Sequence, residues 1–404
     1  MNPDLQRLQP YPFEKLRQLL APYSAPENLD PINLGMGEPR HPAPDFVRTA
    51  LTEKLDLLAN YPATRGIPEL RTAIADWLRR RFQLAAMDPE SQVLPVAGTR
   101  EALFAIAQAC IDRSCNPLVL SPNPFYQIYE GAALLAGAEL QFLDCRAGNN
   151  MQPDFDSVSE ESWQRCQLLY LCSPGNPTGA VLSQDTLQKL IDLARVHDFI
   201  IASDECYSEI YPDEDAPPPG LLQACASGDN PDYRNCVVFH SLSKRSNLPG
   251  LRSGFVAGDA KLLERFLLYR TYQGCALPLQ HQWASALAWQ DEEHVRENRA
   301  LYRVKFDSVL EILSDAMPVT RPEAGFYLWP ETPGSDTEFA AGLFQEQALT
   351  VLPGSFLGRD SGSGNPGEQR IRMALVAGIE ECVEAAHRIV SHLSNSSRHS
   401  PGAN

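Results

Sequence analysis

Residues 68–78 and 183–194 show the spacing of apolar residues that is typical of helices packed on a core. The first stretch begins with Pro68, which suits the first turn of a helix, and the second with Ser183, whose hydroxyl can cap one. In each stretch, four apolar residues recur at intervals that place them on one helical face. They are Leu70, Ile74, Trp77 and Leu78 in the first stretch and Leu187, Leu190, Ile191 and Ala194 in the second. We expect both helices to bury this face.

Short apolar runs between the helical stretches have the length of buried strands. They span Gln167–Cys172, Phe199–Ala202 and Cys236–Phe239. Parallel strands that are covered on both faces read as continuous apolar runs, and strands that alternate with helices form mostly parallel sheets. The pattern predicts an α/β fold, in which a mostly parallel sheet is flanked by helices.

Polar residues follow each apolar run directly, at the point where the strand should end. In open α/β sheets, ligands bind in the crevice beyond the carboxyl ends of the strands. Three segments that are far apart in the sequence should therefore bring their polar side chains to one place. These side chains are Asn176, Asp204, Tyr207, Ser241, Ser243 and Lys244.

The composition narrows the possible classes of function. A chain of 404 residues with 44% hydrophobic residues can bury the cores of two domains. Its formal charge of −17 repels nucleic acid and anionic membranes, so we expect neither as a partner. The N-terminus lacks the pattern of a signal peptide and no run is long enough to span a bilayer, which predicts a cytoplasmic protein. The 10 cysteines lack the CxxC spacing of a metal knuckle, so we expect reduced thiols and no metal.

The residue types expected at the sheet edge suit one cofactor. A lysine whose pKa is lowered can form a Schiff base with a carbonyl group. An aspartate can pair with a protonated pyridine nitrogen, while tyrosine and asparagine offer neutral hydrogen bonds to a phenolic oxygen. An arginine near small hydroxyl residues can hold a phosphate. Lys244, Asp204, Tyr207, Asn176 and Arg252 together predict a site for pyridoxal 5′-phosphate.

The sequence resembles the class I and II aminotransferases, which are fold-type I pyridoxal-phosphate enzymes, from Asn33–Pro39 (NLGMGEP) to Arg370–Leu375 (RIRMAL). Ser241–Gly254 (SLSKRSNLPGLRSG) is similar to the family's cofactor-lysine motif. The resemblance implies a large cofactor-binding domain and a smaller α/β domain. It also implies Lys244 bound covalently to the cofactor, Ser241, Ser243 and Arg252 at the phosphate, Asp204 at the pyridine nitrogen, and Tyr207 and Asn176 at the phenolic oxygen.

Two further segments resemble cofactor-binding parts of the family. Ala97–Leu103 (AGTREAL) is similar to a loop that enters a helix, and the resemblance implies that the backbone N–H groups of Gly98, Thr99 and Arg100 face the phosphate. A helix N-terminus is a suitable anion site on physical grounds. Pro124–Tyr129 (PFYQIY) resembles the segment whose aromatic ring stacks on the pyridine ring, which points to Tyr126, although an aromatic residue there could simply belong to the core.

The resemblance also implies a homodimer with shared active sites and a clamp for the substrate. Tyr61 matches a tyrosine that reaches the phosphate in the neighbouring subunit. Gly37 matches a glycine that lets the backbone approach the substrate carboxylate, and Arg372 matches the arginine that binds this carboxylate with two hydrogen bonds. Asn176 is expected to bind the substrate as well. Arg370 and Arg372 would lie on the same face of a strand, so spacing alone does not choose between them. The family motif favours Arg372.

The implied reaction is transamination with ping-pong kinetics, in which Lys244 moves the Cα proton. The segments Leu8–Arg17 (LQPYPFEKLR) and Gly37–Pro42 (GEPRHP) look like the succinyldiaminopimelate aminotransferases of bacterial lysine synthesis, which use glutamate and 2-oxoglutarate as the second pair. Arg40, His41 and Arg65 are candidates for binding the distal carboxylates, or else ordinary surface residues.

Other functions stay open at this point. The same scaffold serves aminotransferases for aspartate, alanine or aromatic amino acids, and pyridoxal-phosphate lyases that cleave C–S bonds. A non-enzymatic regulator with an aminotransferase-like ligand domain is a further alternative, but it would need a basic DNA-binding module.

The domains are expected at 1–43 (N-terminal arm and part of the small domain), 44–289 (large cofactor domain) and 290–394 (small C-terminal domain), with a disordered tail at 395–404. We also expect an acidic, proline-rich surface loop at Tyr211–Gly220 and a flexible loop at Gly358–Gly367.

Overall fold

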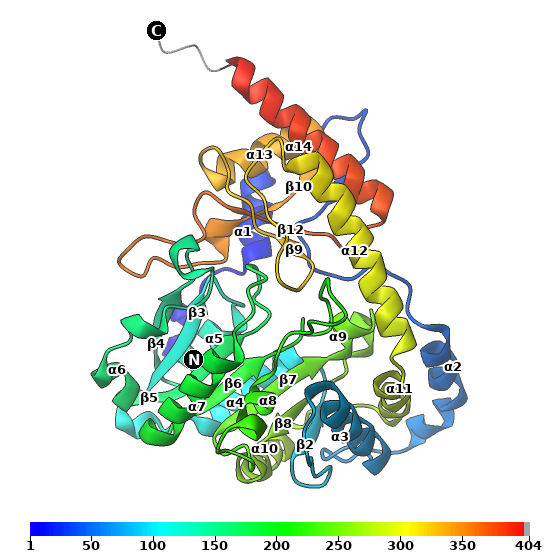
Figure 1. The fold of residues 1–404 in the computed structure, drawn as a ribbon, viewed down its shortest axis with the longest axis vertical. Helices are drawn as coiled ribbons and strands as arrows, with labels where there is room; N and C mark the ends of the chain where they lie inside the picture. Colours follow the sequence, from blue (N-terminus) through cyan, green and yellow to red (C-terminus); the bar gives the residue numbers. More distant parts are fainter. Residues whose placement is uncertain (400–404) are drawn as a thin grey trace.

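A seven-stranded sheet forms the centre of the larger part of the molecule (Figure 1). The computed structural model describes residues 1–399, and side chains as far as residue 395. The strands lie in the order β2-β8-β7-β6-β5-β3-β4, and only β8 runs antiparallel to its neighbours. Their bounds are β2 Val93–Val96, β3 Leu118–Asn123, β4 Glu139–Asp144, β5 Cys166–Cys172, β6 Ile200–Asp204, β7 Cys236–Ser241 and β8 Gly254–Gly258. The prediction of a mostly parallel sheet in an α/β fold is confirmed.

Helices cover both faces of this sheet, and each face has its own hydrophobic core. One core includes residues of α2 (Asp45–Glu53), α3 (Pro68–Phe82), α7 (Gln184–His197), α8 (Leu221–Ser227) and α11 (Leu279–Gln290). The other includes residues of α4 (Thr99–Cys110), α5 (Ile128–Leu135) and α10 (Ala260–Gln273). Two short helices, α6 (Glu160–Arg165) and α9 (Leu242–Arg245), also belong to this part of the molecule. Successive residues of β7 enter opposite cores, as Val237 and Val238 do, because side chains alternate along a strand.

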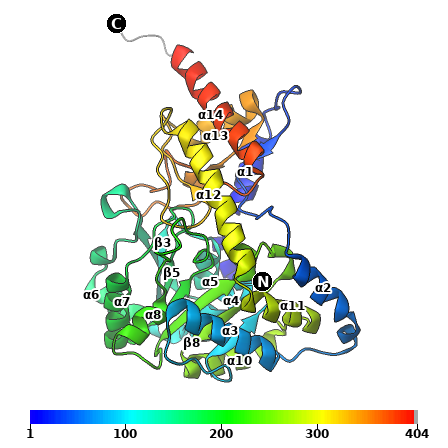
Figure 2. The same ribbon diagram turned by 45° about the vertical axis from the view of Figure 1, so that its right-hand side comes forward.

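A smaller part packs above the carboxyl ends of the central strands (Figures 1 and 2). Its strands are β1 Ile32–Asn33, β9 Tyr327–Leu328, β10 Leu349–Thr350, β11 Leu352–Pro353 and β12 Ile371–Ala374. They form an antiparallel sheet, β11-β12-β9, and a parallel pair, β1 with β10. Its helices are α1 Pro12–Leu20, α12 Glu293–Leu313, α13 Asp336–Gln347 and α14 Ile379–His399. The long helix α12 begins beside the large sheet and ends in the smaller part.

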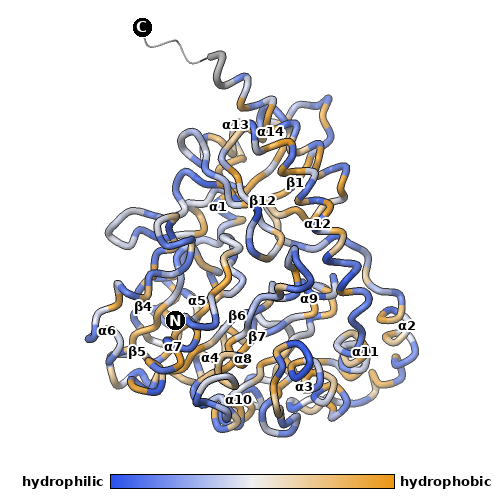
Figure 3. Tube along the Cα trace, in the orientation of Figure 1, coloured by the Kyte–Doolittle hydropathy of each residue, from blue (hydrophilic) through white to orange (hydrophobic). Residues whose placement is uncertain are grey.

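The two predicted helices and the three predicted strands are present. The Ser183 hydroxyl accepts a hydrogen bond from the Thr186 N–H and so caps α7, and the four apolar residues of each predicted stripe are buried. Hydrophobic positions gather in the strands and in the helix faces against them (Figure 3). The domain boundaries at residues 44, 290 and 394 stay a prediction.

The expected disorder of the tail is wrong for residues 395–399, because α14 continues to His399. A helix that is already packed extends at low cost, since each added residue gains one hydrogen bond without a new nucleus. Residues 400–404 lie outside the described residues. The loop at Tyr211–Gly220 reaches the surface at 213–217, and the loop at Gly358–Gly367 is hydrogen-bonded to Arg146 through the carbonyls of Ser363 and Gly364. Within the described chain, no helix is long and apolar enough to cross a membrane.

Candidate active site

A cavity of about 770 Å³ lies at the carboxyl ends of the central strands. Segments from both parts of the molecule line it, including the starts of α1, α4 and α9 and the strand β12. Twelve of the fourteen residues predicted for the site line this one cavity. They are Gly37, Thr99, Arg100, Tyr126, Asn176, Asp204, Tyr207, Ser241, Ser243, Lys244, Arg252 and Arg372. The predicted convergence of segments that are distant in sequence is therefore present in the fold.

Lys244 places a reactive amine in this cavity. It follows β7 in the short helix α9, and its Nζ donates a hydrogen bond to the carbonyl of Gly37 and lies 5.2 Å from the centre of the Phe326 ring. Burial lowers the pKa of Lys244 to about 8, and the positive charges of Arg372 and Arg100 act in the same direction. A lysine with this pKa is partly neutral near physiological pH and can act as a nucleophile or a base.

Asp204 places a buried carboxylate on the cavity wall. It is the last residue of β6 and only 5% exposed. Its carboxylate accepts hydrogen bonds from the Tyr129 hydroxyl (2.8 Å) and the Cys206 N–H (3.3 Å). Burial raises the pKa of Asp204, while these hydrogen bonds oppose the rise. A buried anion with no lysine or arginine hydrogen-bonded to it is suited to a cationic ligand group, such as a protonated pyridine nitrogen.

Arg372 directs its guanidinium into the cavity from β12. It donates to the Asn176 side-chain oxygen (3.0 Å) and to the Gly35 carbonyl (2.8 Å), while its buried Nε has no hydrogen-bond partner. Arg370, the alternative, precedes β12 and donates instead to the Trp329 carbonyl and to Glu331, outside this cavity. The structure thus separates the two arginines that strand periodicity could not separate.

Gly37 brings backbone close to two reactive side chains. Its carbonyl accepts the hydrogen bond from Lys244, and a Cβ atom at this position would lie 2.2 Å from the Tyr327 hydroxyl. The Tyr327 hydroxyl also lies 2.9 Å from the Tyr207 hydroxyl. Burial raises the pKa of Tyr207, so it is a neutral hydrogen-bond donor at physiological pH. Only glycine fits at position 37 without moving this pair.

A group of donors at one end of the cavity suits an anion. Helix α4 starts at Thr99 and its N-cap residue Gly98, at φ 89°, has no side chain to cap the free N–H groups. A Cβ atom at Gly98 would lie 2.1 Å from the Arg252 guanidinium, so this glycine, although outside the cavity wall, allows Arg252 to approach the helix start. Ser241 and Ser243 line the same cavity, where the Ser241 hydroxyl accepts from the Ser243 N–H and donates to the Ser253 carbonyl. Free backbone N–H groups, hydroxyls and a guanidinium are the donors that proteins use for phosphate.

Tyr126 and Arg100 stand together at the wall near α1. The Arg100 Nε donates to the Tyr126 hydroxyl (2.6 Å), and its guanidinium lies 5.8 Å from the centre of the Tyr11 ring. Burial raises the pKa of Tyr126, so its phenol stays neutral. Tyr126 and Arg100 both line the cavity, so this pair can contact a bound ligand.

Four residues considered from the sequence lie elsewhere. The Tyr61 side chain is fully exposed and does not line the cavity of its own chain. Arg40 pairs with Glu381, His41 binds Asn298, and Arg65 donates to the carbonyl of Glu90. Arg40, His41 and Arg65 do not line the cavity, so the suggestion that they bind the distal end of a substrate finds no support within one chain.

Sequence reasoning missed Tyr129 and Tyr327. Tyr129 is three residues after Tyr126, fully buried and stacked on Tyr170, and its hydroxyl reaches Asp204. Tyr129 lies in the segment Pro124–Tyr129, but nothing in the sequence distinguishes a buried tyrosine that donates a hydrogen bond to Asp204 from an ordinary core residue. Tyr327 lies in the two-residue strand β9, which is too short for a periodic pattern.

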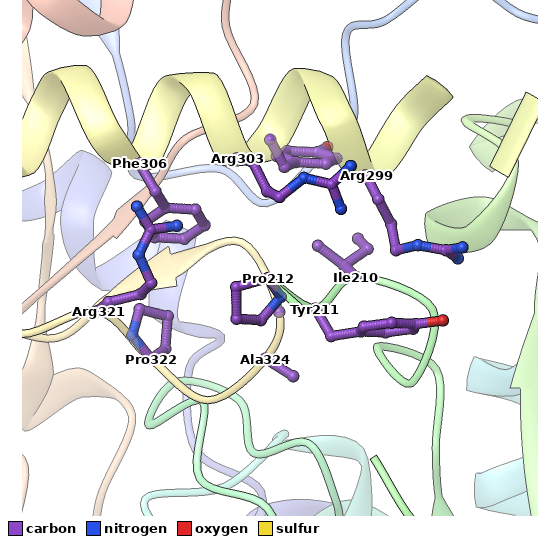
Figure 4. Close-up of a pocket in the computed structure, with 11 residues that line it drawn as sticks. Ile210, Tyr211, Pro212, Arg299, Arg303, Phe306, Arg321, Pro322 and Ala324 are labelled. Carbon is purple, nitrogen blue, oxygen red and sulfur yellow. The ribbon is translucent and has the colours of Figure 1, made fainter. Parts of the chain in front are cut away.

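A second, much smaller cavity lies between the loop after Tyr207 and helix α12 (Figure 4). Its volume is about 10 Å³, which is enough for one water molecule. Arg299 and Arg303 on its wall both donate to Glu214 of the acidic loop. This cavity shares no lining residue with the larger one and marks a contact between the two parts of the molecule.

The donor set defines a class of enzyme that holds pyridoxal phosphate. A buried amine of lowered pKa, a buried carboxylate, a neutral phenol and a phosphate cradle surround one cavity, and the buried Arg372 Nε remains without a partner. Each feature fits one part of that cofactor or an amino-acid carboxylate beside it. Among residues 1–399, no group of three or more metal-ligating side chains could hold a metal ion.

Comparison with known proteins agrees with this class. Residues 30–389 match the family model for aminotransferase class I and II, and the chain belongs to this family. It is therefore a pyridoxal-phosphate-dependent transaminase of fold-type I, whose substrates are amino acids and keto acids.

Individual relatives cover almost the whole chain. An LL-diaminopimelate aminotransferase from Nitratidesulfovibrio vulgaris is 32% identical over 96% of this chain and 97% of its own length. An aminotransferase structure from Neisseria meningitidis is 50% identical, with a TM-score of 0.93 over 97% of this chain and 99% of that one. A structure from Thermus thermophilus, described as a probable N-succinyldiaminopimelate aminotransferase, is 26% identical, with a TM-score of 0.82 over 94% and 100%.

Proposed function

We propose that this transaminase acts on a diaminopimelate-type amino acid and uses glutamate and 2-oxoglutarate as its second substrate pair. The observation that carries the proposal is a surplus cation in the cavity. Arg252 lies in the phosphate cradle and Arg372 lies where an α-carboxylate would bind, which leaves the Arg100 side chain for a further anionic group. The names of relatives with the free and the succinylated substrate support the same class.

When bound, pyridoxal phosphate supplies the electron sink that makes the Cα proton of the amino acid acidic. We assign Lys244 as the group that holds the cofactor and then moves this proton, because its amine is partly neutral near pH 8. Asp204 holds a negative charge against the ring nitrogen, and Tyr207 with Asn176 donates to the phenolic oxygen. Arg372 fixes the α-carboxylate, which orients the Cα proton toward Lys244.

The free and the succinylated substrates differ in charge at the distal end. Free diaminopimelate carries an ammonium and a carboxylate there, whereas the succinylated form carries an amide and two carboxylates. Glu38 and Arg100 both line the cavity, so it offers a partner for either sign. We favour the succinylated form, because the segments around Tyr11 and Gly37 resemble enzymes that use it.

Steady-state assays with both forms test the substrate. We expect higher kcat/KM for the succinylated compound than for free LL-diaminopimelate, aspartate, alanine or aromatic amino acids. Arg100→Gln should raise KM for the diaminopimelate compound at least about tenfold while leaving KM for alanine within about twofold, because alanine has no distal carboxylate. Equal rates with small amino acids would contradict the proposal. Release of pyruvate from cystathionine would instead indicate a C–S lyase.

We also propose a homodimer in which Tyr61 completes the partner's phosphate site. Tyr61 is fully exposed beside Leu58 and Leu55, which are exposed as well, as expected for a surface that a second copy covers. Mixed dimers of Lys244→Ala and Tyr61→Ala chains test this idea. If the site is shared, one site in each mixed dimer is intact, so activity should exceed that of either parent. A mixture no more active than its parents would refute the shared site.

A further inference from the structure

His41 connects the smaller part of the molecule to the backbone of Lys244. Its Nε2 lies 2.6 Å from Lys305 Nζ, and its Nδ1 lies 2.7 Å from the Asn298 side-chain oxygen. Lys305 and Asn298 belong to α12 and are only 3% and 2% exposed. Asn298 in turn donates to the carbonyls of Lys244 and Arg245, both at 3.4 Å.

The donors and acceptors of this chain can be assigned in one consistent way. The Lys305 ammonium has only donors, so His41 Nε2 must accept and the proton must sit on Nδ1. Nδ1–H then donates to the Asn298 oxygen, which also accepts from the Asn247 amide at 3.0 Å. The Asn298 amide nitrogen is left to donate to the two carbonyls. The His41 ring is therefore neutral, and burial lowers the pKa of His41, which keeps it so.

The same segment reaches Lys244 a second time. Four residues before His41, the Gly37 carbonyl accepts the hydrogen bond from Lys244 Nζ. The segment 37–41 is thus connected to Lys244 at two points. Gly37 binds the side-chain amine of Lys244, and His41 is linked through Asn298 to the backbone carbonyl of Lys244. A shift of His41 would move Gly37 and Lys244 relative to each other.

We infer that His41 and Asn298 are positioning residues that set the separation between the carboxylate-binding backbone at Gly37 and the proton-transferring amine of Lys244. The inference rests on the proposed role of Lys244. Neither residue touches the cavity, so both act only through the segments they hold. Lys305 orients the imidazole but contacts neither Gly37 nor Lys244.

Two substitutions of His41 separate its two hydrogen bonds. An asparagine amide can occupy the place of Nδ1 and still donate to Asn298, whereas it cannot reach Lys305. A glutamine amide reaches the place of Nε2, keeps the contact with Lys305 and loses Asn298. If the hydrogen bond to Asn298 positions Lys244, His41→Gln should be more damaging than His41→Asn, although glutamine is closer to histidine in length than asparagine is.

Steady-state kinetics of the holoenzyme gives the first measurement. We expect kcat to fall about 10- to 100-fold in His41→Gln and in Asn298→Leu, since small displacements of a catalytic group have effects of this size. In His41→Asn and in Lys305→Met it should fall less than about threefold, because both keep the bond between residue 41 and Asn298. Equal losses in all four variants, or a larger loss in His41→Asn than in His41→Gln, would overturn the inference.

Hydrogen exchange of the cofactor-free protein gives a second measurement that does not depend on turnover. His41→Gln and Asn298→Leu should speed exchange in residues 35–42 and 242–248, while His41→Asn should change the second segment little. Unchanged exchange at 242–248 in Asn298→Leu would count against the inference even if activity fell. A wild-type protein that transaminates other amino acids but no diaminopimelate compound would refute the proposed function instead, and the exchange result would still stand by itself.

Discussion

The pKa of Lys244 is the property on which reactivity depends most directly. Burial lowers it to about 8 from the usual 10.5. At pH 7 an amine with a pKa of 8 is about 9% neutral, whereas one with a pKa of 10.5 is about 0.03% neutral, which is a difference of about 300-fold in the reactive form. The cavity therefore does much of the activation of this lysine before any ligand binds.

Two charged neighbours should move this pKa in opposite directions. Arg372 disfavours a second positive charge, so Arg372→Met should raise the pKa of Lys244. Glu38 favours the charged amine, so Glu38→Gln should lower it. Because Glu38 is exposed, its effect should weaken in high salt, whereas the effect of the buried Arg372 should persist.

Competitive labelling of the cofactor-free protein with acetic anhydride measures this pKa without any assumption about catalysis. The extent of modification of Lys244, read by peptide mass spectrometry over a range of pH, should rise with a midpoint near 8. Lys189, an exposed lysine, serves as the reference for reagent decay. A midpoint near 10.5 in the wild type, or a lower midpoint in Arg372→Met, would refute the account of how the cavity activates Lys244.

Two further predictions concern stability. Tyr129→Phe removes the hydroxyl bound to Asp204 and should cost about 1.5–3 kcal/mol. The pKa of Asp204 is raised in the folded protein, so the contribution of Asp204 to stability is full below its unfolded pKa and is lost as pH rises. Removal of the Tyr129 hydroxyl should raise the folded pKa of Asp204 further. The melting temperature of the variant should therefore fall increasingly below that of the wild type as pH increases. Glu214→Gln should cost at most about 1 kcal/mol at neutral pH, because this carboxylate is partly exposed. Hydrogen bonding to Arg299, supported by Arg303, lowers the pKa of Glu214 to about 2, so the difference in melting temperature should vanish as pH falls from about 4.5 toward 2.

The site could be predicted where local sequence determines both the element and its end. Asn176, Asp204 and Lys244 each follow an apolar run within a few residues, and parallel strands end at the same edge of a sheet. Their meeting in one cavity therefore required only the strand assignments. Arg372 is a different case, since a strand places residues two apart on one face. The strand starts at Ile371, so Arg370 lies before it and turns to Glu331, and no pattern in the sequence fixes that start.

The partners of isolated charged residues could not be predicted in this way. Arg40 finds Glu381 across 341 positions, and His41 finds Asn298 across 257. Such pairs depend on how α12 and α14 pack over the N-terminal segment, which local periodicity does not specify. The sequence offered His41 as a candidate ligand of the substrate, whereas the structure places it outside the cavity, where we infer that it positions the active-site backbone.

The charge of the site explains how so acidic a chain can bind anions. At physiological ionic strength, interactions between exposed charges are screened beyond about 8 Å, so most of the formal charge of −17 has little effect inside the cavity. The charged residues that line the cavity are Arg100, Arg252, Arg372 and Lys244, together with Glu38 and Asp204. In the proposed function, Asp204 would be matched by a protonated ring nitrogen, and the cofactor phosphate and an α-carboxylate would occupy Arg252 and Arg372. A substrate without a distal carboxylate would leave the third arginine matched only by exposed Glu38 or water. Small neutral amino acids should therefore gain the least from this cavity, and that expectation ties the choice of substrate to Arg100 rather than to the net charge of the protein.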